Sequence, residues 1–288
     1  MTTTGFVSPE WLGKDGFILE EDGTQIPLYS TKLKGLVSLT CTPPWALHVT
    51  WSGASETQEK LKRALTRLHT SVVVVDLGPK ALPGLEPPKG WVDVPRHTRQ
   101  LALNEAFEDT LPKTRIKQAR RFERESGTLE IHQNSNGWDD VFKLHLASRD
   151  RKGLHAHPKK LEALIKDISC TDWTFCVLAR NAQGECIASG GFVILPDHTC
   201  IYAFGGQTRS QASGRASVSM LLEAMRHAQK QGCTVFDFGG SQDPGVDRFY
   251  AEFGSDVVFM RRWVCTPRWL RWIFPRVWRQ WTAPSIHR

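Results

Sequence analysis

The stretch of residues 71–78, SVVVVDLG, constrains the fold of this chain more than any other. Successive side chains of a β-strand point to opposite faces, so a β-branched run without polar alternation predicts a strand that is buried on both faces. A helix is predicted before it, at residues 56–69, because apolar side chains recur there at helical spacing: Leu61, Ala64, Leu65 and Leu68. Strands are also predicted at GLVSLT and HVTW, and FILEEDGTQIPLYS is expected to form a hairpin that turns at Asp22-Gly23.

The same mixture of strands and helices begins again near residue 134, after a long basic helix predicted at 106–126. Two helices, WDDVFKLHLASR and PKKLEALIKDI, precede the strands DWTFCVLAR, ECIASGGFVIL and TCIYAFGG, and another helix leads to CTVFDFGG and DVVFMRRWV. Two successive groups of strands and helices predict an α/β chain with mixed (α+β) sheets. The two domains are expected at 1–133 and 134–265, followed by a tail at 266–288. A length of 288 residues is sufficient for two domains.

The composition, 40% apolar and 23% charged, is that of a soluble globular protein. The seven cysteines are scattered without a C-x-x-C pair, which predicts reduced thiols. The first fifteen residues lack the basic start and apolar core of a secretory signal, and no apolar run approaches the roughly 18 to 20 residues of a spanning helix. No third ligand accompanies His155 and His157, so no metal site is expected. We expect a cytoplasmic protein.

The net charge of +7 is concentrated at one end of the chain. From Arg261 to Arg288 there are seven arginines and no carboxylate, interleaved with tryptophans. Wound as a helix from Thr266, with a kink at Pro275, this segment has arginines on one face and on the other Leu270, Ile273, Phe274, Val277, Trp278 and Trp281. Such a helix is typical of a membrane interface, and the lack of acidic residues favours an anionic surface at the inner membrane face. The alternative is a terminal helix docked on the body.

Residues 202–220, YAFGGQTRSQASGRASVSM, run from a strand end through a loop into a helix. The unpaired N–H groups and the positive dipole end of a helix start suit a pyrophosphate. Small side chains let phosphates approach the backbone, and an arginine adds a charge-assisted contact. The predicted binding residues are Gln211, Ser213, Gly214, Arg215 and Ala216. The alternative is a polar helix start with Ser213 as its N-cap.

This loop resembles the acyl-CoA pyrophosphate loop of GNAT N-acyltransferases, whose pattern is matched by Gln211, Gly214 and Ala216. FDFGG followed by GVDRFYAEFG looks like the closing motif of FemABX-like transferases, a GNAT branch built from two tandem GNAT-like domains. EEDGTQIPLYSTKLKG, LPKTRIKQARRFERESGTLEI and SRDRKGLHAHP resemble other segments of that family in the same order, so the resemblance covers nearly the whole chain. FemABX-like proteins add amino acids or other acyl groups to amines, often on cell-wall precursors.

The resemblance implies roles for three catalytic candidates. GNAT enzymes that use acyl-CoA often employ a tyrosine hydroxyl as acid to the departing thiolate, a role that Tyr250 could fill unless it is only packed under the last strand. Asp237 and Glu223 are candidate bases or acceptor contacts, although Asp237 could equally be a capped strand-end residue. Amino-acid-transferring members commonly carry a lysine where this chain has Tyr250, which argues against aminoacyl-tRNA as donor.

Other features bear on where ligands would lie. The pairs Gly190-Gly191, Gly205-Gly206 and Gly239-Gly240 are expected to let ligand and backbone come close. Arg149 and Lys152, in the domain-entry segment of the resemblance, and Arg248 are candidate contacts to the acceptor.

Together these features predict an N-acyltransferase that moves an acyl group from acyl-CoA, as donor substrate, to the amine of an envelope or lipid precursor. The first alternative is an aminoacyl-tRNA-dependent aminoacyltransferase of the peptidoglycan-bridge type, with tRNA as partner. The second is a non-catalytic ligand-binding protein on the same fold.

Overall fold

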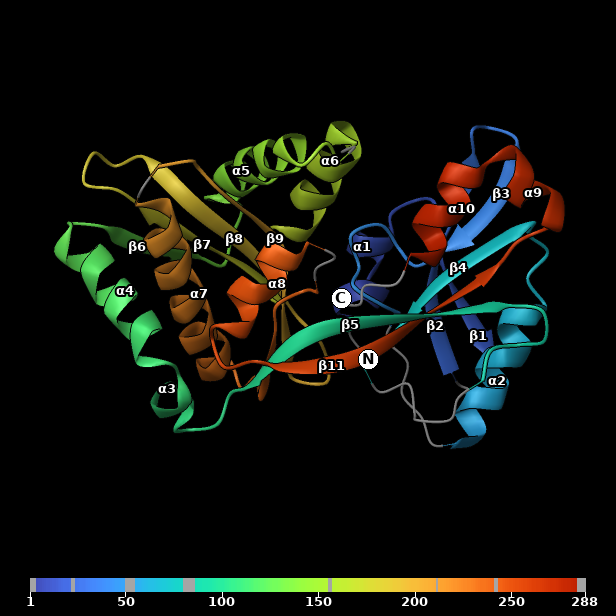
Figure 1. Cartoon of the computed structure of the whole chain (residues 1–288), viewed down its shortest axis with the longest axis horizontal. Coiled ribbons are helices and arrows are strands. Elements are labelled where there is room, and N and C mark those ends of the chain that lie inside the picture. Colours follow the sequence, from blue (N-terminus) through green and yellow to red (C-terminus); the bar gives the residue numbers. More distant parts are fainter. Residues whose placement is uncertain are drawn as a thin grey trace. The chain divides into compact units, whose positions relative to one another are not determined.

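The computed structural model describes residues 4–21, 24–49, 55–79, 86–154, 157–210, 212–240 and 243–283. The chain divides into two compact units (Figure 1). Unit 1 comprises residues 1–98, 240–244 and 257–288, and unit 2 comprises residues 99–239 and 245–256. Strands β5 (Val92–Ala102) and β11 (Asp256–Cys265) contribute residues to both units. The predicted boundary after residue 133 falls inside unit 2, where the helix and strand before it pack against later elements.

Unit 1 has the strand order β1-β2-β3-β4-β11. Its strands β1 (Gly16–Glu21), β2 (Thr24–Leu33) and β3 (Val37–Cys41) are antiparallel, and the predicted turn at Asp22-Gly23 lies outside the described residues. Strand β4 (Val72–Leu77) runs parallel to β3 and antiparallel to β11. The 3₁₀ turn η1 (Gly5–Val7) and helices α1 (Pro9–Leu12), α2 (Ser55–Thr66), α9 (Arg268–Ile273) and α10 (Pro275–Thr282) complete the unit.

Strand β4 is buried on both faces, as the valine run predicts. On one face Val73, Val75 and Leu77 pack in a core with side chains of α2, and on the other Val72 and Val74 pack with residues of β11 and the tail. The tail residues in this second core are Leu270, Phe274, Trp278 and Trp281. The tail is therefore docked on unit 1 through these side chains. Pro275 ends one helix and begins the next.

Unit 2 has the strand order β5-β10-β9-β8-β7-β6. The bounds are β6 (Thr128–His132), β7 (Thr174–Arg180), β8 (Cys186–Ile194), β9 (Thr199–Gln207) and β10 (Val235–Asp237), and of these neighbours only β9 and β10 are parallel. Helices α4 (Lys113–Arg124) and α7 (Ser213–Lys230) cover one face, and α5 (Trp138–Arg151) and α6 (Pro158–Ile168) lie on the other (Figure 1). The predicted helix at 106–126 is two helices, α3 (Phe107–Thr110) and α4, separated at Pro112, and α8 (Pro244–Ala251) precedes β11.

All seven cysteines are free thiols, as expected. Burial raises the pKa of Cys41 and of Cys176 to about 12, so both thiols stay protonated at neutral pH. Within the described part of the chain, no helix has both the length and the apolar character that crossing a membrane requires.

Candidate active site in unit 2

The sheet of unit 2 opens where β10 ends. The last residue pair between β10 and β9 is Asp237 with Ile201, whereas β9 continues to Gln207. Beyond that pair β9 remains hydrogen-bonded to β8, and no other described strand pairs with its second edge. Side chains of α5 occupy part of this edge, because the Gly205 N–H donates to Nδ1 of His145 at 3.2 Å and Nη2 of Arg151 donates to the Gln207 oxygen at 2.7 Å. Backbone groups at a strand edge that neither a strand nor a side chain engages are available to a ligand. The open edge of β9, residues 202–207, leads directly to the loop before α7.

The start of α7 is tied to the end of β9 by two serines. Ser213 is buried, and its hydroxyl donates to the backbone oxygens of Thr208 and Ser210 at 2.9 and 2.6 Å. The hydroxyl of Ser217, one turn later, donates to Oε1 of Gln207. Ser213 therefore does not cap the helix, and the amides at the start of α7 have no side-chain cap in the described structure. A helix start in this condition is suited to bind an anion.

Four of the five predicted phosphate-binding residues, 213–216, lie at this helix start. A Cβ on Gly214 would meet nothing within 4 Å, so the space beside it is open. Ala216 is fully buried and serves packing. Arg215 is held by Glu125, with its Nη2 at 2.7 Å from the carboxylate, so Glu125 competes with a phosphate for this side chain. Gln211 lies outside the described residues.

The glycine pairs in the strands serve packing within the protein. A Cβ on Gly206 would lie 2.1 Å from the backbone oxygen of Leu144, so the glycine lets α5 approach β9. A Cβ on Gly205 would collide with the hydroxyl of Tyr202, and Gly190 and Gly191 are likewise filled by neighbouring side chains. The space where side chains of these four glycines would lie is therefore filled by the protein itself, and their approach to a ligand stays a prediction. Gly239, with φ of +82°, lies against the backbone of Tyr202, where β9 and β10 part.

Two tyrosines lie together beside the open edge. Tyr250 of α8 packs against Phe238 with ring centroids 5.0 Å apart, and against Tyr202 of β9 edge to face at 6.4 Å. Tyr202 in turn stacks on Phe192 at 5.2 Å. Sequence reasoning missed Tyr202. The available signal was that only three tyrosines occur in the chain and that this one shares a strand with the predicted phosphate loop.

The two predicted carboxylates occupy different surroundings. Asp237 is fully buried, and its two oxygens accept from the Gly239 N–H and the Gln100 amide, both at 2.8 Å. This arrangement holds the strand end in place. Glu223 lies near the middle of α7 and pairs with Arg226 at 3.4 Å, whose other partner is Glu108 of α3. Ten residues of helix, roughly 15 Å, separate it from Ser213.

The opposite face of β9 is covered by α5, which carries a buried histidine. The Gly205 N–H donates to Nδ1 of His145 at 3.2 Å, and burial together with the nearby Arg149 charge lowers the pKa of His145 to about 4. Arg149 thus lies next to the central strand of the site, and burial lowers the pKa of its guanidinium. Lys152 follows the end of α5 and Arg248 is exposed on α8, and their contacts to the acceptor stay predictions.

The arrangement offers chemistry that acts through backbone and aromatic groups. An open strand edge can hold a carbonyl, the adjacent helix start can hold an anion, and Tyr250 can supply a proton. No group of three or more His, Cys, Asp or Glu that could bind a metal ion is present in the described ranges.

Comparison with known protein families and sequences gives one match. A family model described as an acetyltransferase (GNAT) domain matches residues 113–249, from α4 to α8. No curated protein sequence matches the chain significantly.

Three solved structures resemble nearly the whole chain. FemX is 11% identical with a TM-score of 0.63, covering 88% of this chain and 90% of its own. L-PGS from Bacillus licheniformis is 14% identical with a TM-score of 0.61, covering 94% and 90%. The C-terminal domain of a protein assigned as a lysylphosphatidylglycerol synthetase in Agrobacterium fabrum is 10% identical with a TM-score of 0.61, covering 95% and 91%.

The match to a GNAT acetyltransferase domain over residues 113–249, just under half of the chain, supports a transferase. Because identities this low show the fold alone, the likeness to FemX and L-PGS means that the chain has the two-domain, GNAT-like fold of FemABX-like proteins, as the sequence predicted.

Proposed function

We propose that this protein transfers an acyl group from acyl-CoA to the amine of an envelope or lipid precursor. The observation that supports this most is the open edge of β9, which leads into an uncapped helix start with free space at Gly214. A strand rises about 3.3 Å per residue, so Tyr202 lies roughly 15 Å along β9 from Gln207, comparable to an extended pantetheine arm. A donor with its pyrophosphate on α7 would then place its thioester beside the two tyrosines.

The proposed reaction is nucleophilic attack on a thioester. The amine nitrogen forms a bond to the carbonyl carbon, and the carbonyl oxygen accepts hydrogen bonds from N–H groups of the β9 edge as it gains charge. The carbon–sulfur bond then breaks, and the Tyr250 hydroxyl donates its proton to the departing thiolate. The proton lost by the amine restores the tyrosine through solvent, so the products are an amide and the free CoA thiol.

The acceptor class is proposed from the neighbours in fold. One neighbour in fold is the C-terminal domain of a protein assigned as a lysylphosphatidylglycerol synthetase, and FemABX-like proteins often modify cell-wall precursors. The same neighbours keep aminoacyl-tRNA as the second candidate donor. What favours acyl-CoA is a tyrosine, Tyr250, in place of the lysine common in amino-acid-transferring members, and the match to an acetyltransferase domain.

The test is CoA binding by calorimetry with three variants. Gly214→Ala adds one methyl group to open space and improves helix propensity, whereas Gly214→Val fills the space in front of the helix. We expect wild type to bind CoA, Gly214→Val to bind at least about tenfold more weakly, a loss of about 1.4 kcal/mol, and Gly214→Ala to lie between them. Lys230→Val places the same side chain at the exposed far end of α7 and should leave binding unchanged.

Absence of CoA binding by the wild type at millimolar ligand would overturn the acyl-CoA proposal. In that case aminoacyl-tRNA, added to the same protein in a gel-shift assay, separates the two alternatives. Retarded migration supports the aminoacyltransferase, and its absence supports the non-catalytic ligand-binding protein.

A further inference from the structure

The docked tail of unit 1 leaves large apolar side chains uncovered. On α9, 85% of Trp272, 61% of Ile273 and 46% of Trp269 is exposed, and in the turn before β3 the exposed fraction of Leu36 is 83%. Isolated apolar side chains are common on protein surfaces, but a contiguous group of large ones marks a binding surface. We refer to Leu36, Trp269, Trp272 and Ile273 as the apolar patch.

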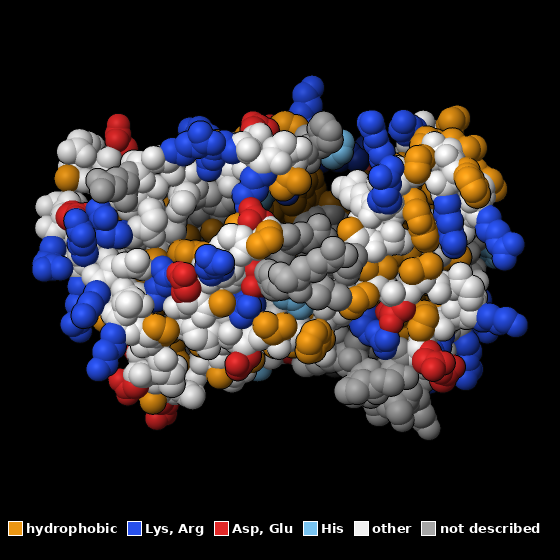
Figure 2. Space-filling model, in the orientation of Figure 1, with side chains coloured by type: hydrophobic (Ala, Val, Ile, Leu, Met, Phe, Trp, Pro, Cys, Tyr) orange, Lys and Arg blue, Asp and Glu red, His pale blue; other side chains and the backbone are white. Residues whose placement is uncertain are grey.

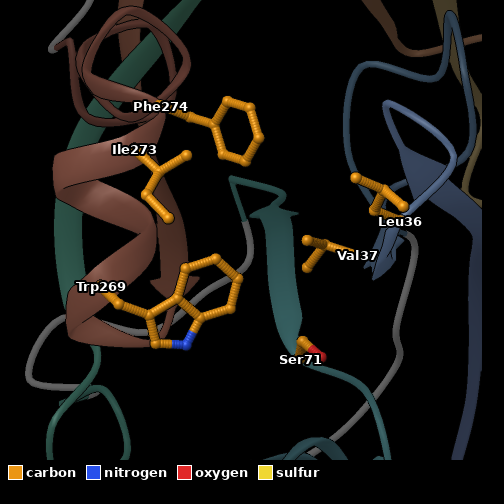
Figure 3. Close-up of a pocket in the computed structure, with 6 residues that line it drawn as sticks. All are labelled: Leu36, Val37, Ser71, Trp269, Ile273 and Phe274. Atoms are coloured by element: carbon orange, nitrogen blue, oxygen red, sulfur yellow. The ribbon is translucent and has the colours of Figure 1, made fainter.

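A groove connects the two parts of the patch. It has a volume of about 360 Å³ and lies between α9 and the turn into β3. Figure 3 shows Trp269, Ile273 and Phe274 on one side of it, facing Leu36 and Val37 on the other, with Ser71 as the one polar side chain in its lining. Leu36 and α9 therefore form one continuous apolar surface, although they are more than two hundred residues apart in the sequence.

Cations surround the apolar patch. Lysine and arginine side chains alternate with hydrophobic ones over α9 and α10 (Figure 2). Lys34 lies 5.2 Å from the ring of Phe274, and Arg271 lies 4.3 Å from the ring of Trp278. Within the described structure no carboxylate pairs with these two or with Arg268, Arg276 and Arg279. The surroundings of the patch therefore carry positive charge that is not neutralised by the protein.

The patch is held in place by the core beneath it. Leu270 is fully buried, and Phe274, Trp278 and Trp281 pack against the valines of β3, β4 and β5. The helices thus display Trp272 and Ile273 without having to fold on contact with a partner. This differs from a free amphipathic tail, which must order itself when it binds.

We propose that the apolar patch and its cations bind the surface of an anionic phospholipid bilayer. Tryptophan is enriched where headgroups meet acyl chains, and lysine and arginine near the surface attract anionic lipids. The acyl chains provide an apolar medium for Leu36 and Ile273, which a nucleic acid lacks. A protein partner would need an acidic rim around an apolar centre, whereas an anionic bilayer presents both properties at every point of its surface.

The experiment is sedimentation of the full chain with vesicles of phosphatidylglycerol and phosphatidylcholine, and with vesicles of phosphatidylcholine alone. No CoA is added, so the result is independent of the transfer reaction. We expect the wild type to pellet with the anionic vesicles and less so as salt rises, because salt screens the charge attraction. Removing the tail is unsuitable, since Leu270 belongs to the core of unit 1.

The variants change exposed side chains only. Trp272→Ser with Ile273→Ser should reduce the partition coefficient on the order of tenfold or more. Arg276→Glu with Arg279→Glu should weaken binding to the anionic vesicles selectively. Leu154→Ser, at a 47% exposed leucine of unit 2, is the matched control and should pellet like the wild type. Thermal unfolding confirms that each variant is folded.

Either of two results in the sedimentation assay, or a third in ultracentrifugation, would overturn the proposal. The first is that the wild type remains in the supernatant with anionic vesicles, and the second is that the Trp272 and Ile273 double variant pellets as well as the wild type. The third is concentration-dependent dimerisation in ultracentrifugation that the double variant abolishes and vesicles do not compete with. That result would assign the patch to a second copy of the chain.

Discussion

Tyr202 and Tyr250 share one aromatic cluster, yet their surroundings differ. Burial raises the pKa of the Tyr202 phenol, whose hydroxyl fits against Gly205, so this tyrosine stays protonated throughout the neutral range. Tyr250 belongs to the short helix α8 and, like Tyr202, is partly buried, with its ring beside Phe238. Of the two, Tyr250 is the better placed to exchange a proton with a ligand.

Replacing each tyrosine in turn with phenylalanine distinguishes a proton donor from a residue that only packs. Under the proposed mechanism Tyr250→Phe should lower the turnover number by about 10²- to 10⁴-fold, since one general acid is lost while the ring remains. Tyr202→Phe should keep most of the activity. Release of the CoA thiol from acetyl-CoA in the presence of an amine measures both. Equal activity of wild type and Tyr250→Phe would restrict Tyr250 to packing.

Among the elements, the contact between α5 and β9 links the two faces of the site. It depends on the missing side chain of Gly206, which admits the backbone of Leu144, and on the hydrogen bond from Gly205 to His145. Because burial and Arg149 lower the pKa of His145 to about 4, the imidazole is neutral in the folded protein at pH 7. Because α5 and β9 are in direct contact, a movement of α5 would shift β9, the strand that is proposed to hold the thioester.

This contact predicts a loss of stability in mild acid. His145 has a pKa of about 4 in the folded protein and about 6.5 when unfolded, so protonation favours the unfolded chain as the pH falls below 6.5. The stabilisation is complete above pH 6.5, and about 2 kcal/mol of it should be lost by pH 5.

His145→Asn removes the titrating group while an amide oxygen can still accept from Gly205. Urea unfolding of wild type and variant at pH 7, 6 and 5 measures the difference, which should be smaller by about 2 kcal/mol at pH 5 than at pH 7. Parallel pH profiles of the two proteins would contradict this account.

Local patterns predicted most elements, including β4 and the loop before α7, because periodicity reports which faces of a segment are apolar. They did not predict what covers those faces. The second face of β4 is covered by the tail, a contact between residues far apart in the sequence. Nor did they place Tyr202, since Ala203 is an extra residue in the β8–β9 register and alters which side chains of β9 share a face. The roles assigned to Asp237 and Glu223 stay predictions.

At the scale of the whole molecule, the two units differ in how far their residues are contiguous in the sequence. The core of unit 2 is drawn from residues 101–253, whereas unit 1 combines residues before 99 with Trp263, Val264 and the tail. The sequence placed the boundary near residue 133 because helix and strand patterns repeat, and repetition alone does not show that β5 and β11 belong to both units.

A test of this division is expression of fragments. Residues 99–256 should fold cooperatively by thermal unfolding monitored by circular dichroism, because their apolar core is complete. Residues 1–98 should not, because β4 lacks β11 and the tail. A cooperatively folded 1–98 fragment would show that the late segments are dispensable for unit 1.

The late arrival of β11 and the tail has a consequence during synthesis. A ribosome adds about 5 to 20 residues per second, so roughly 10 to 40 s separate the appearance of Thr98 from that of Trp281. Unit 2 can fold within that interval. The valines of β4, in contrast, lack their packing partners until Trp263, Val264 and Leu270 have been synthesised. A β-branched strand without its neighbour is prone to pair with other chains. The nascent residues 1–98 are therefore the segment for which a chaperone matters most, although they are made before unit 2.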